Sequence, residues 1–359
     1  MMLKILSRAV LSKSILPVNL ILHVTSRCNC SCKFCFVKKK ITSGMDDLNL
    51  SEIKKISKYF KKLIWLNISG GEPFIREDLE DICFMFYENS RPEWLSIPTN
   101  GSFPSRIKIM CDSLLRKINI PLSIEISIDG IGELHDMVRN FPGAFNCALE
   151  TYSLLKALKK KYRNLYLKVI TVVNNENIDY LENIIKYVRK NMSDIFLHTF
   201  IFARSAANKN DLVLVNKDKL FNKKAILMKT AEVSNNTSVF PDIVLQTLRQ
   251  KVLEINLRTL QENRQIIPCL ADKVDIVIWP NGDVSFCERG TRIGNLRDCD
   301  FHLKELLCSD NGSKIRKQIS KEKCFCTHEC AVLDSILFNI TLYPSIAFEI
   351  IKNLTKNIL

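Results

Sequence analysis

The sequence TSRCNCSCKFCF, residues 25–36, directly follows the short apolar segment 18–24, and a buried strand is predicted over residues 18–25. Residues 25–36 place Cys28, Cys32 and Cys35 in a Cx3Cx2C spacing. A loop this short can present three thiolates to one iron–sulfur cubane and leave one iron without a protein ligand. By the logic that separates catalytic from structural metal sites, the open position is where a cofactor or substrate binds. A zinc site with Cys30 as the fourth ligand is the alternative, but thiolates packed this closely in sequence are cramped for tetrahedral zinc.

Cysteine content points to the same kind of chemistry. The chain has 359 residues and 14 cysteines, most of them near residue 30 or beyond residue 268. Lys4, Arg8 and Lys13 interrupt the apolar N-terminal stretch, so we predict a cytoplasmic protein without a signal peptide. Thiols in that compartment stay reduced, which favours metal binding over disulfides. Three isolated cysteines are interpreted as ordinary buried thiols: Cys83, Cys111 and Cys147.

A formal charge of +14 favours anionic partners. No nucleic-acid recognition motif accompanies the charge, so we interpret it as solvated helix faces and expect no nucleic-acid partner. The two amphipathic ends, residues 1–16 and 335–359, are interpreted as core-packing helices in preference to membrane-contacting ones.

Short β-branched segments alternate with helical patterns along the first two hundred residues. This alternation is typical of parallel βαβ units. We therefore predict an α/β fold, a partial (β/α)6 TIM-like barrel, although the alternation alone leaves a doubly wound sheet open. The predicted strands are 18–25, 64–69, 94–99, 122–128, 165–173 and 195–202, and the predicted helices are 51–62 (capped by Ser51), 78–88, 105–117, 144–162 and 179–191.

Several predicted strands carry polar residues at every second position. Ser123, Glu125 and Ser127 alternate with isoleucines. Helices cover the outer face of a parallel barrel, so the polar residues should point into its lumen. The same reasoning assigns to the lumen His23 and Thr25, Asn67 and Ser69, Lys168, and His198. A polar lumen suits a bound polar cofactor, and sites in such barrels lie at the carboxyl ends of the strands.

Three further motifs follow successive strands and a fourth lies shortly after the last of them; together with the cysteine loop, they make the sequence resemble the radical S-adenosylmethionine superfamily. Phe34 fills the aromatic position of that family's cysteine motif. GGEP stands at 70–73, TNG at 99–101 and SIDG at 127–130, while HDMVRNFPGAF at 135–145 resembles a stretch of the subfamily with extra clusters. The order and placement of these motifs match the family over most of the chain.

The resemblance implies a set of roles. A [4Fe–4S] cluster on the three cysteines would bind S-adenosylmethionine and cleave it reductively, and the resulting 5′-deoxyadenosyl radical would abstract hydrogen from a substrate. The residues it implies for cofactor binding are Gly70, Gly71, Glu72, Asn100, Ser127 and Arg139. For Glu72, the alternative to cofactor binding is that it stabilises the turn. For Arg139, the alternative is a structural ion pair. His135 is interpreted as structural.

A second cysteine group resembles the SPASM or twitch domains that carry auxiliary clusters. Cys269 and Cys287 match the opening Cx12Gx4C, and residues 274–286 have the pattern of a hairpin that turns at Asn281–Gly282. The ending departs from the full pattern, so we expect one auxiliary [4Fe–4S] cluster rather than two. Its ligands would be Cys269, Cys287 and two of Cys324, Cys326 and Cys330. A zinc knuckle is the alternative, and Cys299 and Cys308 are interpreted as bystanders.

The predicted organisation is therefore a radical S-adenosylmethionine core at 18–207 between an N-terminal amphipathic segment at 1–17 and a helical linker at 208–264, with an auxiliary domain at 265–335 and a C-terminal helix at 336–359. The predicted partners are S-adenosylmethionine, an electron donor such as flavodoxin or ferredoxin, and a peptide or small-molecule substrate. A non-enzymatic iron–sulfur or zinc scaffold that keeps the fold is the alternative function.

Overall fold

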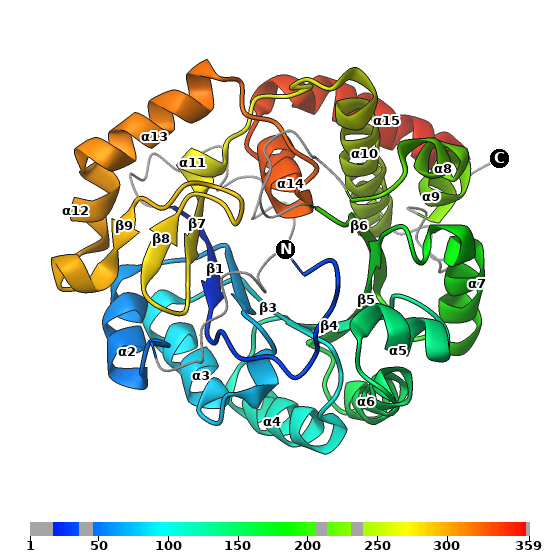
Figure 1. The fold of residues 1–359 in the computed structure, drawn as a ribbon, viewed down its shortest axis with the longest axis horizontal. Helices are drawn as coiled ribbons and strands as arrows, with labels where there is room; N and C mark the ends of the chain where they lie inside the picture. The colour runs from blue at the N-terminus through cyan, green and yellow to red at the C-terminus, as the bar shows by residue number, and fades with distance from the viewer. Residues whose placement is uncertain (1–16, 36–45, 205–213, 231–239, 357–359) are drawn as a thin grey trace.

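A computed structural model describes residues 17–35, 46–204, 214–230 and 240–356 (Figure 1). The predicted N-terminal segment 1–17 therefore lies outside the described residues except for Pro17. Six parallel strands form an arc, with most helices on its outer side (Figure 1). These strands are β1 (Asn19–His23), β2 (Trp65–Ser69), β3 (Trp94–Thr99), β4 (Leu122–Ser127), β5 (Leu165–Val173) and β6 (Leu197–Phe202). Each lies within a predicted strand, and the partial barrel is confirmed.

The helices between these strands follow the predicted pattern with one addition, the short α5. They are α2 (Leu50–Tyr59), α3 (Leu79–Ser90), α4 (Pro104–Lys117), α5 (Glu133–Arg139), α6 (Ala144–Lys159) and α7 (Leu181–Asn191). The prediction that Ser51 caps the first of them is wrong. Asn49 is the cap: its side chain accepts from the backbone N–H of Ser51 and Glu52, and Glu52 reaches back to the Asn49 N–H in a capping box.

The hairpin of the second cysteine group continues the barrel sheet. It consists of β7 (Asp275–Ile278) and β8 (Asp283–Ser285), with the short β9 (Gly294–Asn295) beyond. β7 runs parallel to β1, so the order is β6-β5-β4-β3-β2-β1-β7-β8-β9. Among the described strands, β6 and β9 form the two edges and the sheet does not close. The auxiliary segment therefore begins as an extension of the barrel wall.

The two faces of the sheet differ as the period-two pattern predicts. Ile124 and Ile126 are fully buried in the core between sheet and helices, while Ser123, Glu125 and Ser127 occupy the opposite face. The prediction that His198 faces the lumen is wrong. In the parallel register His198 lies opposite Val169, a residue of the outer core, and its Nε2 is 2.8 Å from the Thr171 hydroxyl.

The C-terminal third supplies helices around the open side of the sheet. α14 (Glu329–Leu337) packs against both α10 (Phe240–Glu262) and α11 (Ala271–Val274), and α15 (Tyr343–Lys356) packs on α10 (Figure 1). The remaining helices are α8 (Lys217–Asn222), α9 (Lys224–Thr230), α12 (Leu303–Cys308) and α13 (Asp310–Lys321). Within the described ranges, no single helix is long and apolar enough to span a membrane; α14 and α15 pass that test only as a pair bent by 77°.

Candidate active site at the carboxyl ends of the strands

The cysteine loop and the GGEP turn are joined backbone to backbone. The Gly71 N–H donates to the Thr25 carbonyl at 2.8 Å, and the Glu72 N–H donates to the Arg27 carbonyl at 2.9 Å. A Cβ on Gly71 would lie 2.1 Å from the Arg27 oxygen, and one on Gly70, whose φ is +143°, would lie 2.5 Å from the Thr25 oxygen. Both positions therefore require glycine. The pair of glycines lets the second strand's loop rest directly on the loop that carries the cysteines.

Two charged side chains hydrogen-bond the residues that lead into the cysteine loop. Asp47 accepts from the Thr25 hydroxyl at 2.7 Å and from the Ser26 N–H at 3.1 Å. Arg76, which is nine-tenths buried, donates to the carbonyls of Val24 and Leu48 at 2.6 and 2.7 Å. Charge-assisted hydrogen bonds to backbone groups hold a loop more tightly than neutral ones do. The segment before the cysteines is thus anchored independently of any cluster.

Glu72 links the second motif to the third. Its buried carboxylate accepts from the Asn100 N–H at 2.7 Å, from the Thr99 hydroxyl at 2.9 Å and from the Phe74 N–H at 3.2 Å. Burial raises the pKa of Glu72 to about 7, although these hydrogen bonds act in the opposite direction. With both oxygens engaged, Glu72 has the geometry of a residue that positions the turn, the alternative that its sequence left open.

Asn100 connects the third motif back to the cysteines. Its amide nitrogen lies 2.9 Å from the Asn29 Oδ1 and 3.2 Å from the Cys30 sulfur, and its Oδ1 accepts from the Ser102 N–H. The side chain of Asn100 is therefore already engaged with the cysteine loop. Because Cys30 shares this contact, the cysteine outside the Cx3Cx2C pattern has a local structural partner.

Arg139 brings a positive charge close to the thiols of Cys28 and Cys32. The guanidinium Nε lies 2.6 Å from the Asp129 carboxylate of the SIDG motif, and the group faces the Phe34 ring at 5.6 Å. A hydrogen bond from Cys30 and, more weakly, the charge of Arg139 lower the pKa of Cys28 to about 6 against the effect of burial. Burial raises the pKa of Cys32 to about 11, and Arg139 opposes that rise. The electrostatic environment thus favours thiolate at Cys28, as an iron ligand requires.

The three thiols share one loop without converging on one point. Across the described ranges, no group of three or more His, Cys, Asp or Glu side chains is gathered closely enough to hold a metal ion. Cluster binding would therefore require the thiols to turn toward a common centre. The donor set fits an iron–sulfur cluster nonetheless, since Cys28, Cys32 and Cys35 follow one another in a short anchored loop beside a buried cation.

Comparison with known proteins decides the family of this region. The model of the radical SAM superfamily matches residues 22–188, which include the end of β1, the cysteine loop and β2 to β5. The chain carries a radical SAM domain. An uncharacterised protein of Methanocaldococcus jannaschii is 30% identical over 178 residues, 47% of this chain and 58% of the relative. A cysteine-type anaerobic sulfatase-maturating enzyme of Clostridium novyi is 30% identical over 190 residues, 48% of this chain and 47% of that enzyme. This chain therefore spans about half the length of these curated relatives.

The fold extends the likeness beyond the radical SAM domain. A solved structure of anSMEcpe, with bound AdoMet and a peptide named Cp18Cys, superimposes with a TM-score of 0.57. That match covers 94% of this chain and 99% of the other, at 16% sequence identity. The shared fold thus includes the segment that carries the second cysteine group.

Four cysteines of this second group influence one another electrostatically. Cys326, Cys324 and Cys287 all act on Cys269, and Cys326 and Cys324 also act on Cys287. Cys330 differs, because the largest electrostatic influences on it come from the carboxylates of Glu288, Asp334 and Glu329. Of the three candidates for the last two ligand positions, the structure therefore sets Cys330 apart from the other thiols.

Sequence reasoning missed a buried polar bridge between the radical SAM domain and this segment. Glu288, next to Cys287, contacts His23 of β1 at 3.1 Å and also pairs with His328 at the start of α14. His23 stacks on Trp279 with ring centroids 4.5 Å apart and planes 2° from parallel. Although burial acts in the opposite direction, the two histidines lower the pKa of Glu288 well below its ordinary value. The only sequence signal was that Glu288 follows Cys287 and that His328 lies between Cys326 and Cys330.

The lumen also holds a nearly buried ion pair. Lys168 and Glu125, opposite each other on β5 and β4, are 2.9 Å apart. The Lys168 ammonium also faces the rings of Trp94 and Trp65 at 5.4 and 5.9 Å. The predicted lumen placement of Glu125 and Lys168 agrees with the structure. The pair lies on the lumen face two residues below Ser127, the last residue of β4.

Proposed function

We propose that this chain is a radical SAM enzyme in which Cys28, Cys32 and Cys35 bind a [4Fe–4S] cluster. The observation that carries the proposal is the hydrogen-bonded convergence of the cysteine loop, GGEP and TNG at one end of the barrel. When bound, the cluster and S-adenosylmethionine would supply one-electron cleavage of the sulfonium to a carbon radical that abstracts hydrogen from a substrate. A scaffold without catalysis has no need for this convergence, so we do not favour that alternative.

The residues around the loop would divide the work of holding S-adenosylmethionine. Gly70 and Gly71 lack side chains, so backbone groups can approach the methionyl ammonium closely. Ser127, at the end of β4, is placed to hydrogen-bond the ribose, and Asn100 to contact the cofactor through the cysteine loop. Arg139 would supply positive charge near the methionyl carboxylate while Asp129 holds its Nε. Glu72 would contribute indirectly, by keeping the GGEP and TNG turns together.

We further propose one auxiliary [4Fe–4S] cluster bound by Cys269, Cys287, Cys324 and Cys326. The mutual electrostatic influence of these thiols supports this set over one that includes Cys330. With four protein ligands and no open iron, the cluster would relay electrons rather than bind substrate. A flavodoxin or ferredoxin is the class of donor proposed for the chain.

The substrate would enter the lumen beside S-adenosylmethionine, above the Glu125–Lys168 pair. We favour a peptide over a small molecule as the substrate. The solved structure that shares this fold over nearly its whole length contains a bound peptide. Deuterium labelling separates peptide modification from small-molecule oxidation. The true substrate, supplied in deuterated form, should transfer deuterium to 5′-deoxyadenosine.

The deciding experiment uses the full chain reconstituted anaerobically with iron and sulfide, then incubated with dithionite and S-adenosylmethionine. We expect 5′-deoxyadenosine from the native chain and none from the variants Cys28→Ala, Cys32→Ala or Cys35→Ala. The exposed Cys308→Ala is the matched control and should retain activity. Product from any of the first three variants, or none from the native chain, would contradict the proposal.

A further inference from the structure

The C-terminal helix α15 has an inner face that packs on α10. Ile346 is buried there, the Asn353 amide donates to the Thr247 hydroxyl at 2.9 Å, and the Glu349 carboxylate pairs with Lys251 at 3.1 Å. These positions recur every three to four residues, so they lie along one side of the helix. The inner face is thereby assigned to packing within the chain.

The outer face of α15 is apolar and exposed. Phe348 is 69% exposed and Ile351 60%, and Ile340, in the turn just before the helix, is 61% exposed. Pro344 and Ala347 are also exposed and, by helical spacing, lie on the same face as Phe348 and Ile351. Of the few large hydrophobic side chains that the described part of the chain leaves open to solvent, three belong to α15 or the turn before it. An exposed apolar helix face of this kind marks an interaction surface.

The charge on and around this face selects its partner. Among positions 340, 344, 347, 348, 351, 352 and 355, the sequence has no acidic residue and one cation, Lys352. The chain as a whole carries +14, which opposes pairing with a second copy of itself and favours an anionic partner. An apolar helix face with a lysine at its margin, on a basic protein, has the chemistry of a helix that lies in the interface of an anionic bilayer.

The neighbouring helix shows that the segment would lie on a bilayer rather than cross it. α14 and α15 are bent by 77° relative to each other. Ile336 and Leu337 of α14 are buried against α10 and α15, so α14 belongs to the folded interior. Of these two helices, as far as the described residues show, the outer side of α15 is the surface open to a membrane.

We propose that α15 docks this protein on anionic lipid surfaces, with Ile340, Phe348 and Ile351 inserted among the acyl chains and Lys352 at the headgroups. The proposal is independent of the radical SAM activity. It also modifies the sequence interpretation of this end as a core-packing helix, which describes only the inner face of α15.

The test is flotation of the full-length chain with vesicles of phosphatidylcholine alone or mixed with phosphatidylglycerol. We expect binding to the anionic vesicles, and at least about tenfold weaker binding for the double variant Phe348→Ser/Ile351→Ser, because it removes the two largest apolar side chains of the helix face. Lys352→Glu should weaken binding about fivefold. The matched control is Ile109→Ser on α4, which removes an equally exposed isoleucine (64%) and should leave binding unchanged.

Equal vesicle binding by the native chain and the double variant would overturn the proposal, as would absence of binding by the native chain. Two further measurements address other occupants of the face. A lower melting temperature of the double variant would show that the chain itself covers the face, and a native dimer that the double variant converts to monomer in sedimentation would show a second copy there. Either result would also overturn the proposal.

Discussion

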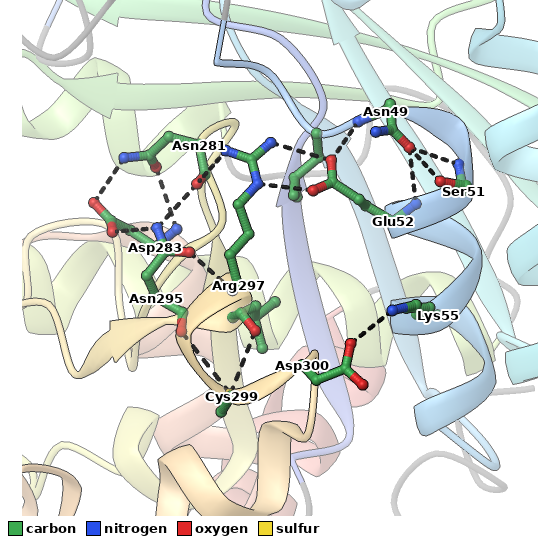
Figure 2. A network of polar contacts seen from close by, with 12 residues as sticks. Asn49, Ser51, Glu52, Lys55, Asn281, Asp283, Asn295, Arg297, Cys299 and Asp300 are labelled. Carbon is green, nitrogen blue, oxygen red and sulfur yellow. Dashed lines mark hydrogen bonds and ion pairs between the residues drawn. The ribbon is translucent and has the colours of Figure 1, made fainter.

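Arg297 forms a two-pronged ion pair with Glu52 across the seam between the auxiliary segment and the barrel (Figure 2). The Nε–Oε1 distance is 2.7 Å and the Nη2–Oε2 distance is 3.1 Å. Glu52 also accepts from the Asn49 N–H in the capping box of α2. The Glu52 carboxylate therefore helps to cap the N-terminus of α2 and also links α2 to the turn after β9.

We predict that Arg297→Met lowers the free energy of unfolding by ~1 kcal/mol, the upper range for a partly exposed ion pair with bidentate geometry. Lys55→Met is the matched control, because Lys55 and Asp300 form a single, more exposed contact across the same seam (Figure 2). Its effect on the unfolding free energy should be clearly smaller, because solvent screens an exposed pair. Urea unfolding of both variants measures the difference; equal effects would show that the two-pronged geometry adds nothing.

The glycine that lets two motifs touch gives a second prediction. Gly71→Ala would place a Cβ 2.1 Å from the Arg27 carbonyl, so the GGEP turn must move away from the cysteine loop. We expect a loss of ~3 kcal/mol or more in unfolding free energy and poor cluster reconstitution. Gly132→Ala is the control, since its Cβ would meet nothing within 4 Å and only its φ of +57° is strained. It should cost about 1 kcal/mol and leave iron content normal; similar iron contents in both variants would count against the loop contact.

Glu72 allows positioning to be separated from direct cofactor contact. Glu72→Ala removes the acceptor for the Asn100 and Phe74 N–H groups and the Thr99 hydroxyl, so we expect a loss of ~2–3 kcal/mol in unfolding free energy. Glu72→Gln keeps an acceptor oxygen and should lose less. If Glu72 only positions the turns, Glu72→Gln should still show the native change in the cluster's EPR signal when S-adenosylmethionine is added. Loss of that change in a stable Gln variant would assign Glu72 a direct contact instead.

The barrel strands could be predicted from sequence because each is a short β-branched segment whose alternation is local. The relation of β7 to β1 could not, since a pairing between Asn19 and Asp275 joins residues far apart in sequence. The face of His198 was misjudged because the polar neighbours His198 and Thr199 lie on opposite faces of β6, so polarity does not define which face is inside. The neighbour that satisfies His198, Thr171, lies on another strand.

The site divides along the same line. The loop cysteines form one short sequence motif and the glycines another, so both could be predicted. The hydrogen-bond network that joins the two motifs could not. Thr99 and Asn100 hydrogen-bond the Glu72 carboxylate, and this contact depends on how the ends of β2 and β3 meet in space. The Glu288 bridge to His23 and His328 required the same three-dimensional information.

The second cysteine group gives a prediction about iron content. We expect Cys330→Ser to retain about eight irons per chain and Cys324→Ser to fall to about four, because only the latter removes a ligand of the proposed auxiliary cluster. Metal and sulfide analysis of the reconstituted proteins makes the comparison. Loss of iron in the Cys330 variant together with retention in the Cys324 variant would reverse the assignment, and zinc in place of iron would favour the knuckle.

A buried pair of carboxyl groups, Asp275 on β7 and Asp334 on α14, predicts how stability varies with pH. Burial raises the pKa of Asp334 to about 6, and burial together with Asp334 raises the pKa of Asp275 well above its usual range. Both carboxyl groups therefore hold their protons to a higher pH in the folded chain than in the unfolded chain. In the unfolded chain both would ionise near pH 4. Folding thus binds protons between pH 4 and 6, and stability must fall as pH rises through that window.

We expect Asp334→Asn, which mimics the protonated acid, to stabilise the chain at pH 8 by up to about 3 kcal/mol, the free energy of a pKa shift of roughly two units. The gain should shrink below pH 6 and vanish near pH 4, where the native Asp334 is itself protonated in both states. Asp194→Asn is the control, because Asp194 is half-exposed and pairs with Lys156, which lowers its pKa. That variant should destabilise the chain slightly at pH 8. Melting temperatures of the three proteins across this range provide the measurement, and a pH-independent gain for Asp334→Asn would show that packing rather than ionisation is responsible.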